Sequence, residues 1–246
     1  MRNIKLTMEY DGSRYSGWQR LGKGESENTI ENKLLEVLNK MTGEALELNC
    51  GSRTEAGVHA YAQVANFKTS SDLKLYEIKN YLNRYLPMDI AVTHVEEVPE
   101  RFHATLNAKA RTYLYRIALG DAPSVFDRKY TYYSFRKPDP EKMREAAQLL
   151  IGKHDFKDFS TVKKSKSTLR EIYRIDVEEK GKELHLTIKA NDFLHNMARM
   201  LAATLLEVGL GQRTPEEMPA ILDPKQDVAG SLPANAQGLF LKNIEY

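Results

Sequence analysis

The order of the elements that the sequence predicts is the feature that most limits the fold. Apolar and polar residues alternate over residues 4–10, which is typical of a half-buried strand. Apolar residues at helical spacing follow, and the first half continues as two strands, a second helix and a strand. The second half repeats this β-α-β-β-α-β order without obvious sequence identity. Two split-βαβ halves in tandem are the arrangement that this doubled order favours.

The expected elements can be given as residue ranges. In the first half we expect strands at 4–10, 45–50, 62–67 and 90–95, and helices at 30–42 and 75–85. In the second half we expect strands at 110–118, 170–177, 183–189 and 239–244, and helices at 140–151 and 193–208. Asn28 and Glu31 stand three residues apart, which predicts a capping box at the first helix. The expected domains are 1–105 and 106–246.

Composition narrows the class of protein. The 246 residues are enough for two small domains, and 41% hydrophobic with 28% charged residues is ordinary for a globular chain. Cys50 is the single cysteine, so an intramolecular disulfide and a cysteine-based zinc site are excluded. No apolar run approaches the roughly 18 residues that cross a bilayer. We therefore expect a cytoplasmic protein that does not associate with a membrane.

The densest cluster of reactive side chains lies in the loop Gly-Ser-Arg-Thr-Glu-Ala-Gly-Val-His-Ala at 51–60. It places Arg53, Glu55 and His59 between two predicted strands. One interpretation is a polar connection whose glycines make turns and whose charges are solvated. The other is a carboxylate kept ionised and reactive by a neighbouring cation. The spacing alone does not decide between them.

The loop resembles the active-site motif of the tRNA pseudouridine synthase A family, whose pattern is close to RTDAGVHA. Other blocks also resemble that family and follow one another in its order. They are YDGSRYSGWQ at 10–19, NTIENKL at 28–34, RFHA at 101–104, ARTYLYR at 110–116, GKHDFKDF at 152–159, TLREI at 168–172, NDFLHNMAR at 191–199, EVGLGQ at 207–212 and GLFL at 238–241. Because the blocks run through the whole chain, the resemblance is specific.

The resemblance implies a fold, an activity and partners. The fold is α+β, with two ferredoxin-like split-βαβ halves that form a pseudosymmetric sheet with a central basic cleft. The activity is that of an isomerase, which converts uridine to pseudouridine in the anticodon stem-loop of tRNA, at nucleotides 38, 39 or 40. The resemblance also implies a homodimer that binds tRNA and requires no cofactor.

Individual roles follow by position in the matched blocks. The resemblance implies that Arg53 enters the RNA helix where the target base is flipped out, and that Tyr113 stacks on the flipped uracil. It implies that Arg199 pairs with the catalytic carboxylate and that Leu239 forms the floor of the base pocket. Glu55 occupies the catalytic position, where the family has aspartate. Without the resemblance, Tyr113 and Leu239 would be interpreted as core residues.

The glutamate leaves an alternative open. Its extra methylene moves the carboxylate by roughly 1 Å, and a misplacement of that size can cost on the order of 100-fold in rate. Glu55 keeps the charge and the kind of chemistry, so we expect an enzyme. The alternative is a tRNA-binding or tRNA-folding protein that no longer turns over. A generic tandem RNA-binding module is a weaker third hypothesis, because it does not explain the matches at the catalytic positions.

Charge distribution indicates an anionic partner. Residues 101–116 and 161–170 each contain four Lys or Arg residues and no acidic residue, although the net charge of the chain is only +2. Lys163, Lys164 and Lys166 in the second stretch are candidates for contacts with RNA phosphates. A solvated surface is the ordinary alternative for such a run. The six histidines include no pair spaced as a helical metal site, so no metal is expected.

Overall fold

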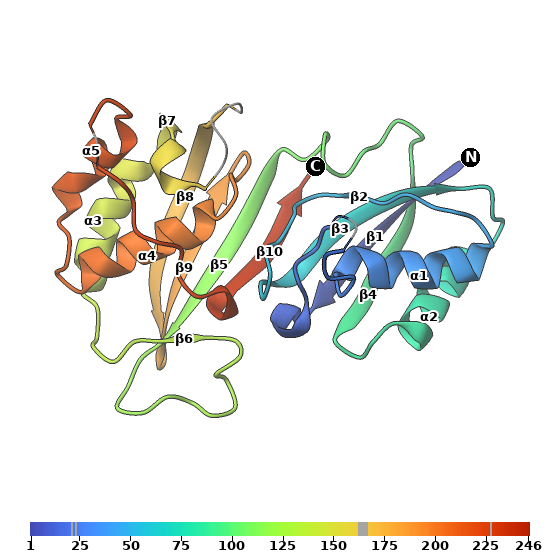
Figure 1. Ribbon diagram of the computed structural model, residues 1–246, viewed down its shortest axis with the longest axis horizontal. Coiled ribbons are helices and arrows are strands. Elements are labelled where there is room, and N and C mark those ends of the chain that lie inside the picture. Colours follow the sequence, from blue (N-terminus) through green and yellow to red (C-terminus); the bar gives the residue numbers. More distant parts are fainter. Residues whose placement is uncertain (21, 23, 162–166, 227) are drawn as a thin grey trace. The chain divides into compact units, whose positions relative to one another are not determined.

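The computed structural model describes residues 1–20, 22, 24–161, 167–226 and 228–246 (Figure 1). Contacts divide the chain into two compact units, Met1–Lys109 with Leu241–Tyr246, and Ala110–Phe240. The sequence-based division lay at residue 105 and left the whole last strand in the second half. In the structure, most of that strand is grouped with the first unit instead, because its contacts lie there.

The first unit has the split-βαβ order of elements. It contains β1 (Arg2–Tyr10), α1 (Ile30–Thr42), β2 (Asn49–Cys50), β3 (His59–Thr69), α2 (Leu75–Tyr85) and β4 (Ile90–Val98), together with most of β10 (Leu239–Glu245). β1 lies between β4 and β3, and β2 pairs with β3 as well, with every one of these pairings antiparallel. The α+β order predicted for this half is confirmed.

The alternation in β1 determines the face that is buried. Ile4, Leu6 and Met8 are fully buried, and Ile4 stands opposite Phe67 of β3 in the register. α1 and α2 cover one face of this sheet (Figure 1). The helices contribute buried side chains at helical spacing, namely Ile30, Leu34 and Leu38 of α1 and Ile78 and Leu82 of α2. Each such side chain stabilises the fold by roughly 1.5–3 kcal/mol.

The start of α1 differs from the prediction. Thr29 is the N-cap residue, so the capping box expected for Asn28 and Glu31 is wrong. Both side chains instead bind the loop that follows β1. The Asn28 amide donates to the Arg14 carbonyl at 2.5 Å, and the Glu31 carboxylate accepts the Arg20 N–H at 2.6 Å. These contacts are long-range, and a local capping rule does not include them.

The second unit repeats the same strand order. Its elements are β5 (Ala110–Ala118), β6 (Tyr132–Tyr133), α3 (Pro140–Leu150), β7 (Gly152–Asp155), β8 (Leu169–Lys180), β9 (Glu183–Ala190), α4 (Met197–Gly209) and α5 (Met218–Leu222). The order β5-β9-β8 corresponds to β1-β3-β2 of the first unit, and β7 adds to the edge of β8. α3 packs against both β8 and α4.

The helix α4 begins four residues later than the sequence predicts. The apolar pattern starts at residue 193, but the helix starts at Met197. Asn196, the residue before it, has φ 63° and lies in the left-handed region, which a right-handed helix does not contain. Residues 193–196 are therefore a separate turn that carries its own apolar side chains.

Candidate active site

The loop at 51–60 connects β2 to β3 and includes the first two residues of β3. Its first residues are held by one buried amide side chain. Gln63 Nε2 donates to the Ser52 carbonyl at 2.7 Å, and Gln63 Oε1 accepts the Ser52 N–H at 3.3 Å. The Gly51 N–H donates to the Val64 carbonyl at 2.8 Å. The amide group of Gln63 thus binds Ser52 as a neighbouring strand would, and the loop leaves the sheet at a fixed point.

Two buried residues anchor the centre of the loop. The Thr54 hydroxyl lies 2.7 Å from the Tyr10 hydroxyl, and the Thr54 carbonyl accepts the Trp18 N–H at 3.0 Å. Burial raises the pKa of Tyr10 above the ordinary tyrosine value, so this hydroxyl stays neutral and able to donate. Val58 is also buried, and its N–H donates to the Glu55 carbonyl at 3.1 Å. The turn that carries Glu55 is therefore fixed on both sides.

Two glycines of the block at 10–19 allow that packing. A β-carbon on Gly12 would stand 1.9 Å from the Val58 carbonyl oxygen. A β-carbon on Gly17 would stand 2.8 Å from the Thr54 carbonyl oxygen, and the φ of Gly17 is +97°. Both distances are shorter than any side chain tolerates. The turn after β1 and the loop at 51–60 therefore form one packed structure that needs glycine at these positions.

The loop presents two charged side chains beside its anchors. Arg53 is exposed and Glu55 is half-buried. Burial raises the pKa of the nearby Cys50 thiol to about 12, against the opposing effect of Arg53, so the thiol is protonated at neutral pH. Arg53 and Glu55 are thus both accessible, and the carboxylate of Glu55 is the acidic group of this loop that solvent reaches.

His59, the histidine of the loop, holds the loop against the turn that follows β1. His59 is buried, with Nδ1 3.1 Å from the Gly12 N–H and 3.2 Å from a carboxylate oxygen of Asp11. Its ring therefore binds the turn after β1. The resemblance assigned it no catalytic role, and its burial is consistent with packing.

The second unit holds Tyr113 within its sheet. Tyr113 lies in β5, stands opposite Ile188 of β9 and is 4% exposed. The ring of Phe193 contacts it edge-on, with the ring centroids 4.9 Å apart and the planes at 77°. This geometry is favourable for two aromatic rings and restricts the orientation of the tyrosine.

Arg199 extends from the first turn of α4 and is held by fixed acceptors. Its Nε donates to the Ala234 carbonyl at 2.6 Å, and its Nη1 donates to Asn196 Oδ1 at 3.1 Å. In return, the Ala234 N–H donates to the Arg199 carbonyl at 3.2 Å. The guanidinium is thus oriented by the residues around it.

Leu239 is the first residue of β10 and is almost fully buried. The segment before it is fastened to β5. The Tyr115 hydroxyl donates to the Asn235 carbonyl at 2.9 Å, and a β-carbon on Gly238 would stand 2.9 Å from the Arg116 carbonyl oxygen. The position of Leu239 is therefore set by close packing on β5.

The predicted site residues are thus divided between the units. Arg53 and Glu55 belong to the first, and Tyr113, Arg199 and Leu239 to the second. Their convergence on one uridine stays a prediction. Lys163, Lys164 and Lys166 lie outside the described residues.

Comparison with known proteins identifies the family. The family model described as tRNA pseudouridine synthase matches residues 6–107 and 146–246. The chain belongs to this family. A relative from Bacillus anthracis, tRNA pseudouridine synthase A 2, is 47% identical over 247 residues, with 100% of both chains covered. tRNA pseudouridine synthase A from Bacillus sp. (strain KSM-64) is 45% identical, again over 100% of both chains.

A solved structure with a distant likeness is the crystal structure of a Cbf5-Nop10-Gar1 complex. It aligns with a TM-score of 0.38 and 12% identity, over 97% of this chain and 48% of that one.

Sequence reasoning missed the residues that position the loop and Arg199 in this member of the tRNA pseudouridine synthase family. Gly12, Gly17 and Gln63 hold the loop, and Asn196 holds the arginine. Both glycines lie in the matched block at 10–19, and Asn196 lies in the block at 191–199. The matched blocks indicated that these three residues have a role, and the contacts in the structure show what that role is.

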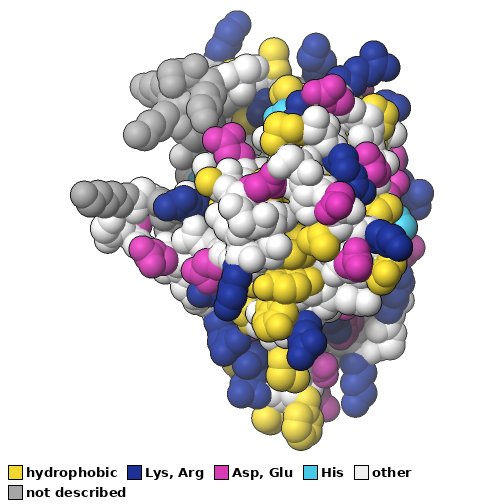
Figure 2. All heavy atoms as spheres, turned by 90° about the vertical axis from the view of Figure 1, so that its right-hand side faces the viewer, with side chains coloured by type: hydrophobic (Ala, Val, Ile, Leu, Met, Phe, Trp, Pro, Cys, Tyr) yellow, Lys and Arg dark blue, Asp and Glu magenta, His cyan; other side chains and the backbone are white. Residues whose placement is uncertain are grey.

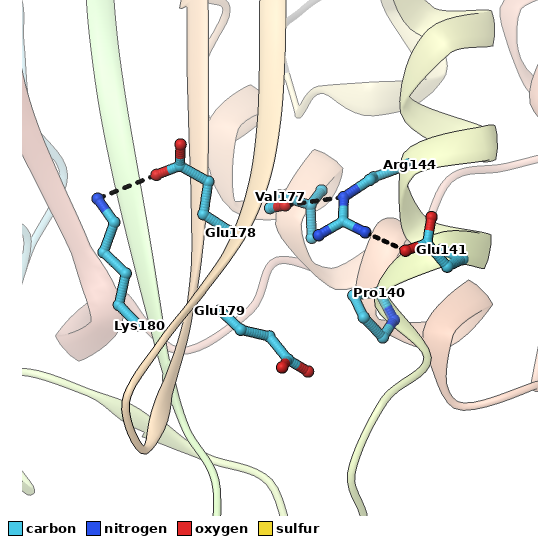
Figure 3. A pocket seen from close by; sticks show the side chains of 7 residues that line it. All are labelled: Pro140, Glu141, Arg144, Val177, Glu178, Glu179 and Lys180. Carbon is cyan, nitrogen blue, oxygen red and sulfur yellow. Dashed lines mark hydrogen bonds and ion pairs between the residues drawn. The ribbon is translucent and has the colours of Figure 1, made fainter.

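One surface hollow of the second unit lies between α3 and the β8–β9 hairpin. Its volume is about 610 Å³, and Figure 3 shows its lining residues, Pro140, Glu141, Arg144, Val177, Glu178, Glu179 and Lys180. Lys180 pairs with Glu178 at 2.9 Å, and Arg144 donates to the Val177 carbonyl at 3.0 Å. Three of the lining side chains are glutamates, which makes this hollow a poor site for an RNA phosphate.

Two further properties concern only the part of the chain that is described. It contains no group of three or more His, Cys, Asp and Glu side chains placed to hold a metal ion. None of its helices combines the length and apolar character needed to span a membrane.

Proposed function

We propose that this chain isomerises uridine to pseudouridine in the anticodon stem-loop of cytoplasmic tRNA, at nucleotides 38, 39 or 40, with Glu55 as the catalytic carboxylate. The observation that carries the proposal is the match to tRNA pseudouridine synthases over the whole chain, at 47% identity. The geometry of the loop supports it, because Glu55 lies between the buried anchors Thr54 and Val58.

The reaction exchanges one bond of the ribose for another. The bond from the sugar C1′ to N1 of uracil breaks, the uracil rotates, and C1′ bonds to C5. The proton of C5 is released, and N1 gains a proton. Glu55 attacks the sugar or otherwise assists the first cleavage, and Arg199 pairs with its carboxylate.

The remaining roles serve the extruded base. Tyr113 stacks on the uracil, Leu239 forms the floor beneath it, and Arg53 fills the position that the base vacates. Extrusion of a base costs a few kcal/mol, and contacts with phosphates offset that cost. The exposure of Arg53 supports its role, since an exposed guanidinium can enter an RNA helix.

In this proposal, the loop accommodates the side chain of Glu55, which is longer than the aspartate of the family. Because the backbone is fixed at Thr54 and Val58, the conformation of the turn determines how far the carboxylate reaches. We propose that this turn returns the Glu55 carboxylate to the sugar. The second candidate function, a tRNA-binding protein without turnover, is favoured by the aspartate-to-glutamate departure alone.

The outer surface of the first unit suits an RNA partner. Figure 2 shows a band of hydrophobic side chains on one face of this unit, with Lys, Arg, Asp and Glu side chains around it. α2 exposes Tyr76 and Tyr85, and the Arg84 guanidinium lies 5.6 Å from the centre of the Tyr85 ring. Interleaved aromatic and basic side chains bind nucleic acids by stacking and charge.

The proposal also includes a homodimer in which one tRNA contacts both subunits. Analytical sedimentation of the protein with and without tRNA tests it.

Mapping of the product tests the proposed substrate. Unmodified tRNA with uridines at 38, 39 and 40 is incubated with the protein, labelled with a carbodiimide and read by primer extension. We expect stops only at these nucleotides. A matched tRNA with cytidine at all three should show none. Pseudouridine elsewhere, in both tRNAs, would contradict the proposed position and leave the activity intact.

A further inference from the structure

Asn196 has a backbone conformation that few residues adopt. With φ 63° and ψ 1°, it is the one residue other than glycine that has a positive φ in the described part of the chain. This region costs free energy for residues with a β-carbon, although asparagine tolerates it better than most. Such strain persists where surrounding contacts require it. The contacts of its side chain indicate what the strain serves.

The side chain of Asn196 does not act as a helix cap. At the residue before a helix, an asparagine oxygen ordinarily accepts a backbone N–H of the first turn. Asn196 makes no such bond. Its Oδ1 accepts instead from Nη1 of Arg199 at 3.1 Å, and its Nδ2 donates to the Thr161 hydroxyl at 3.0 Å. The amide is thus held on one side and directed at the arginine on the other.

Asn196 completes the fixation of the Arg199 guanidinium. The Ala234 carbonyl accepts from Nε at 2.6 Å, so two fixed acceptors bind two of the three nitrogens. A guanidinium carries five N–H donors, and the others can bind a carboxylate. An arginine that is oriented in advance loses less conformational freedom when the reaction begins.

We propose that Asn196 is a positioning residue, which holds the Arg199 guanidinium in the orientation that it needs to pair with the catalytic carboxylate. The inference rests on the proposed function, because the pairing of Arg199 with Glu55 belongs to it. Asn196 acts through Arg199 and has no contact with the uridine in this scheme. Its left-handed backbone is the conformation that directs the amide toward Arg199 and away from the helix N–H groups.

Three substitutions separate positioning from backbone strain. Asn196→Gly adopts the left-handed region freely and lacks the amide, so we expect kcat to fall roughly tenfold, as for loss of a hydrogen bond to a charged group. The KM for tRNA should stay within about twofold, and Tm should equal or exceed that of the wild type. Asn196→Ala lacks the same amide but keeps the strain, so its kcat should match the glycine variant while its Tm falls.

Asn196→Asp tests whether the group at position 196 acts on Arg199 through its charge. Its carboxylate has the shape of the amide but competes with Glu55 for Arg199, so kcat should fall below that of Asn196→Gly with no loss of Tm. A purely structural asparagine would leave kcat of the Gly and Asp variants within about twofold of the wild type, and that result would overturn the proposal.

A second readout does not depend on turnover. Nitrogen-15 NMR of the Arg199 side chain, assigned with Arg199→Lys, reports rotation of the guanidinium. We expect hindered rotation in the wild type and faster rotation in Asn196→Gly, and equal rotation in both would overturn the inference. If the wild type isomerises no uridine, the proposed function fails, whereas this measurement still decides whether Asn196 orients Arg199.

Discussion

Gly12 lies directly against the main chain of Val58, so that a β-carbon on Gly12 would stand 1.9 Å from the Val58 carbonyl oxygen. The relationship joins the turn after β1 to the loop that carries Glu55. The geometry of the candidate catalytic loop is therefore set by a turn that lies 46 residues before Val58 in the chain.

Gly12→Ala should displace the loop. Because the methyl group would overlap a backbone oxygen, we expect destabilisation by roughly 1–3 kcal/mol. Movement of the Glu55 turn by about 1 Å should lower turnover on the order of 100-fold. Thermal unfolding and pseudouridine formation are the measurements. Gly22→Ala is the matched control, since no atom of the described residues lies within 4 Å of its added methyl group. Equal effects of the two substitutions would show that the close contact has no functional consequence.

The hydroxyl pair of Tyr10 and Thr54 should stabilise the loop. Tyr10→Phe removes one partner of a buried 2.7 Å hydrogen bond, and we expect a loss of about 1 kcal/mol in the free energy of unfolding. A double-mutant cycle with Thr54→Val measures the pair directly by denaturant unfolding. The second substitution should cost less in the presence of the first. Strictly additive losses would mean that the two hydroxyls do not interact.

The ion pair between Arg116 and Glu183 should produce an acid-dependent stability. The Arg116 guanidinium donates two hydrogen bonds to the Glu183 carboxylate, at 2.9 and 2.7 Å, and holds the pKa of Glu183 below its usual value of 4.5. The unfolded chain therefore binds the proton more readily. The stabilisation is complete above pH 4.5 and is lost as pH falls through the lower folded-state pKa.

Glu183→Gln tests that linkage. We expect it to lower the free energy of unfolding by about 1 kcal/mol at neutral pH, with the difference from the wild type shrinking in acid. Denaturant unfolding at a series of pH values measures it. A difference that is constant with pH would show that the charge of Glu183 has no part in stability.

The lysine run should contribute to tRNA affinity. Replacing Lys163, Lys164 and Lys166 with Ala should weaken binding and flatten its dependence on salt, because fewer counterions are released. The fold should change by no more than about 0.5 kcal/mol. Titrations of tRNA at several salt concentrations measure the slope. An unchanged slope would identify the run as a solvated surface.

The sequence predicted the elements well where the pattern is local. The alternation of Ile4, Leu6 and Met8 placed β1 and its buried face, because side chains in a strand alternate whatever the partner. The late start of α4 was not predictable from periodicity, since Phe193 and Leu194 extend the apolar pattern while Asn196 breaks the helix.

The residues of the candidate site were predictable from the sequence, but the contacts that hold them in place were not. Arg53 and Glu55 were found from their block of sequence, and the structure places them on the loop at 51–60. The contacts of Gly12 with Val58 and of Asn28 with Arg14 join residues that are distant or unrelated in local pattern. Packing in three dimensions creates these requirements, so no local rule contains them.

The central claim is that Glu55 catalyses the isomerisation, and release of tritium from tRNA labelled at C5 of uracil tests it most directly. The proposal predicts release by the wild type, none by Glu55→Ala, and slower release by Glu55→Asp, whose shorter side chain falls short of the sugar. All three proteins should bind tRNA with similar affinity, since phosphate contacts dominate binding. A silent wild type that Glu55→Asp activates, or wild-type release that survives Glu55→Ala, would contradict the claim.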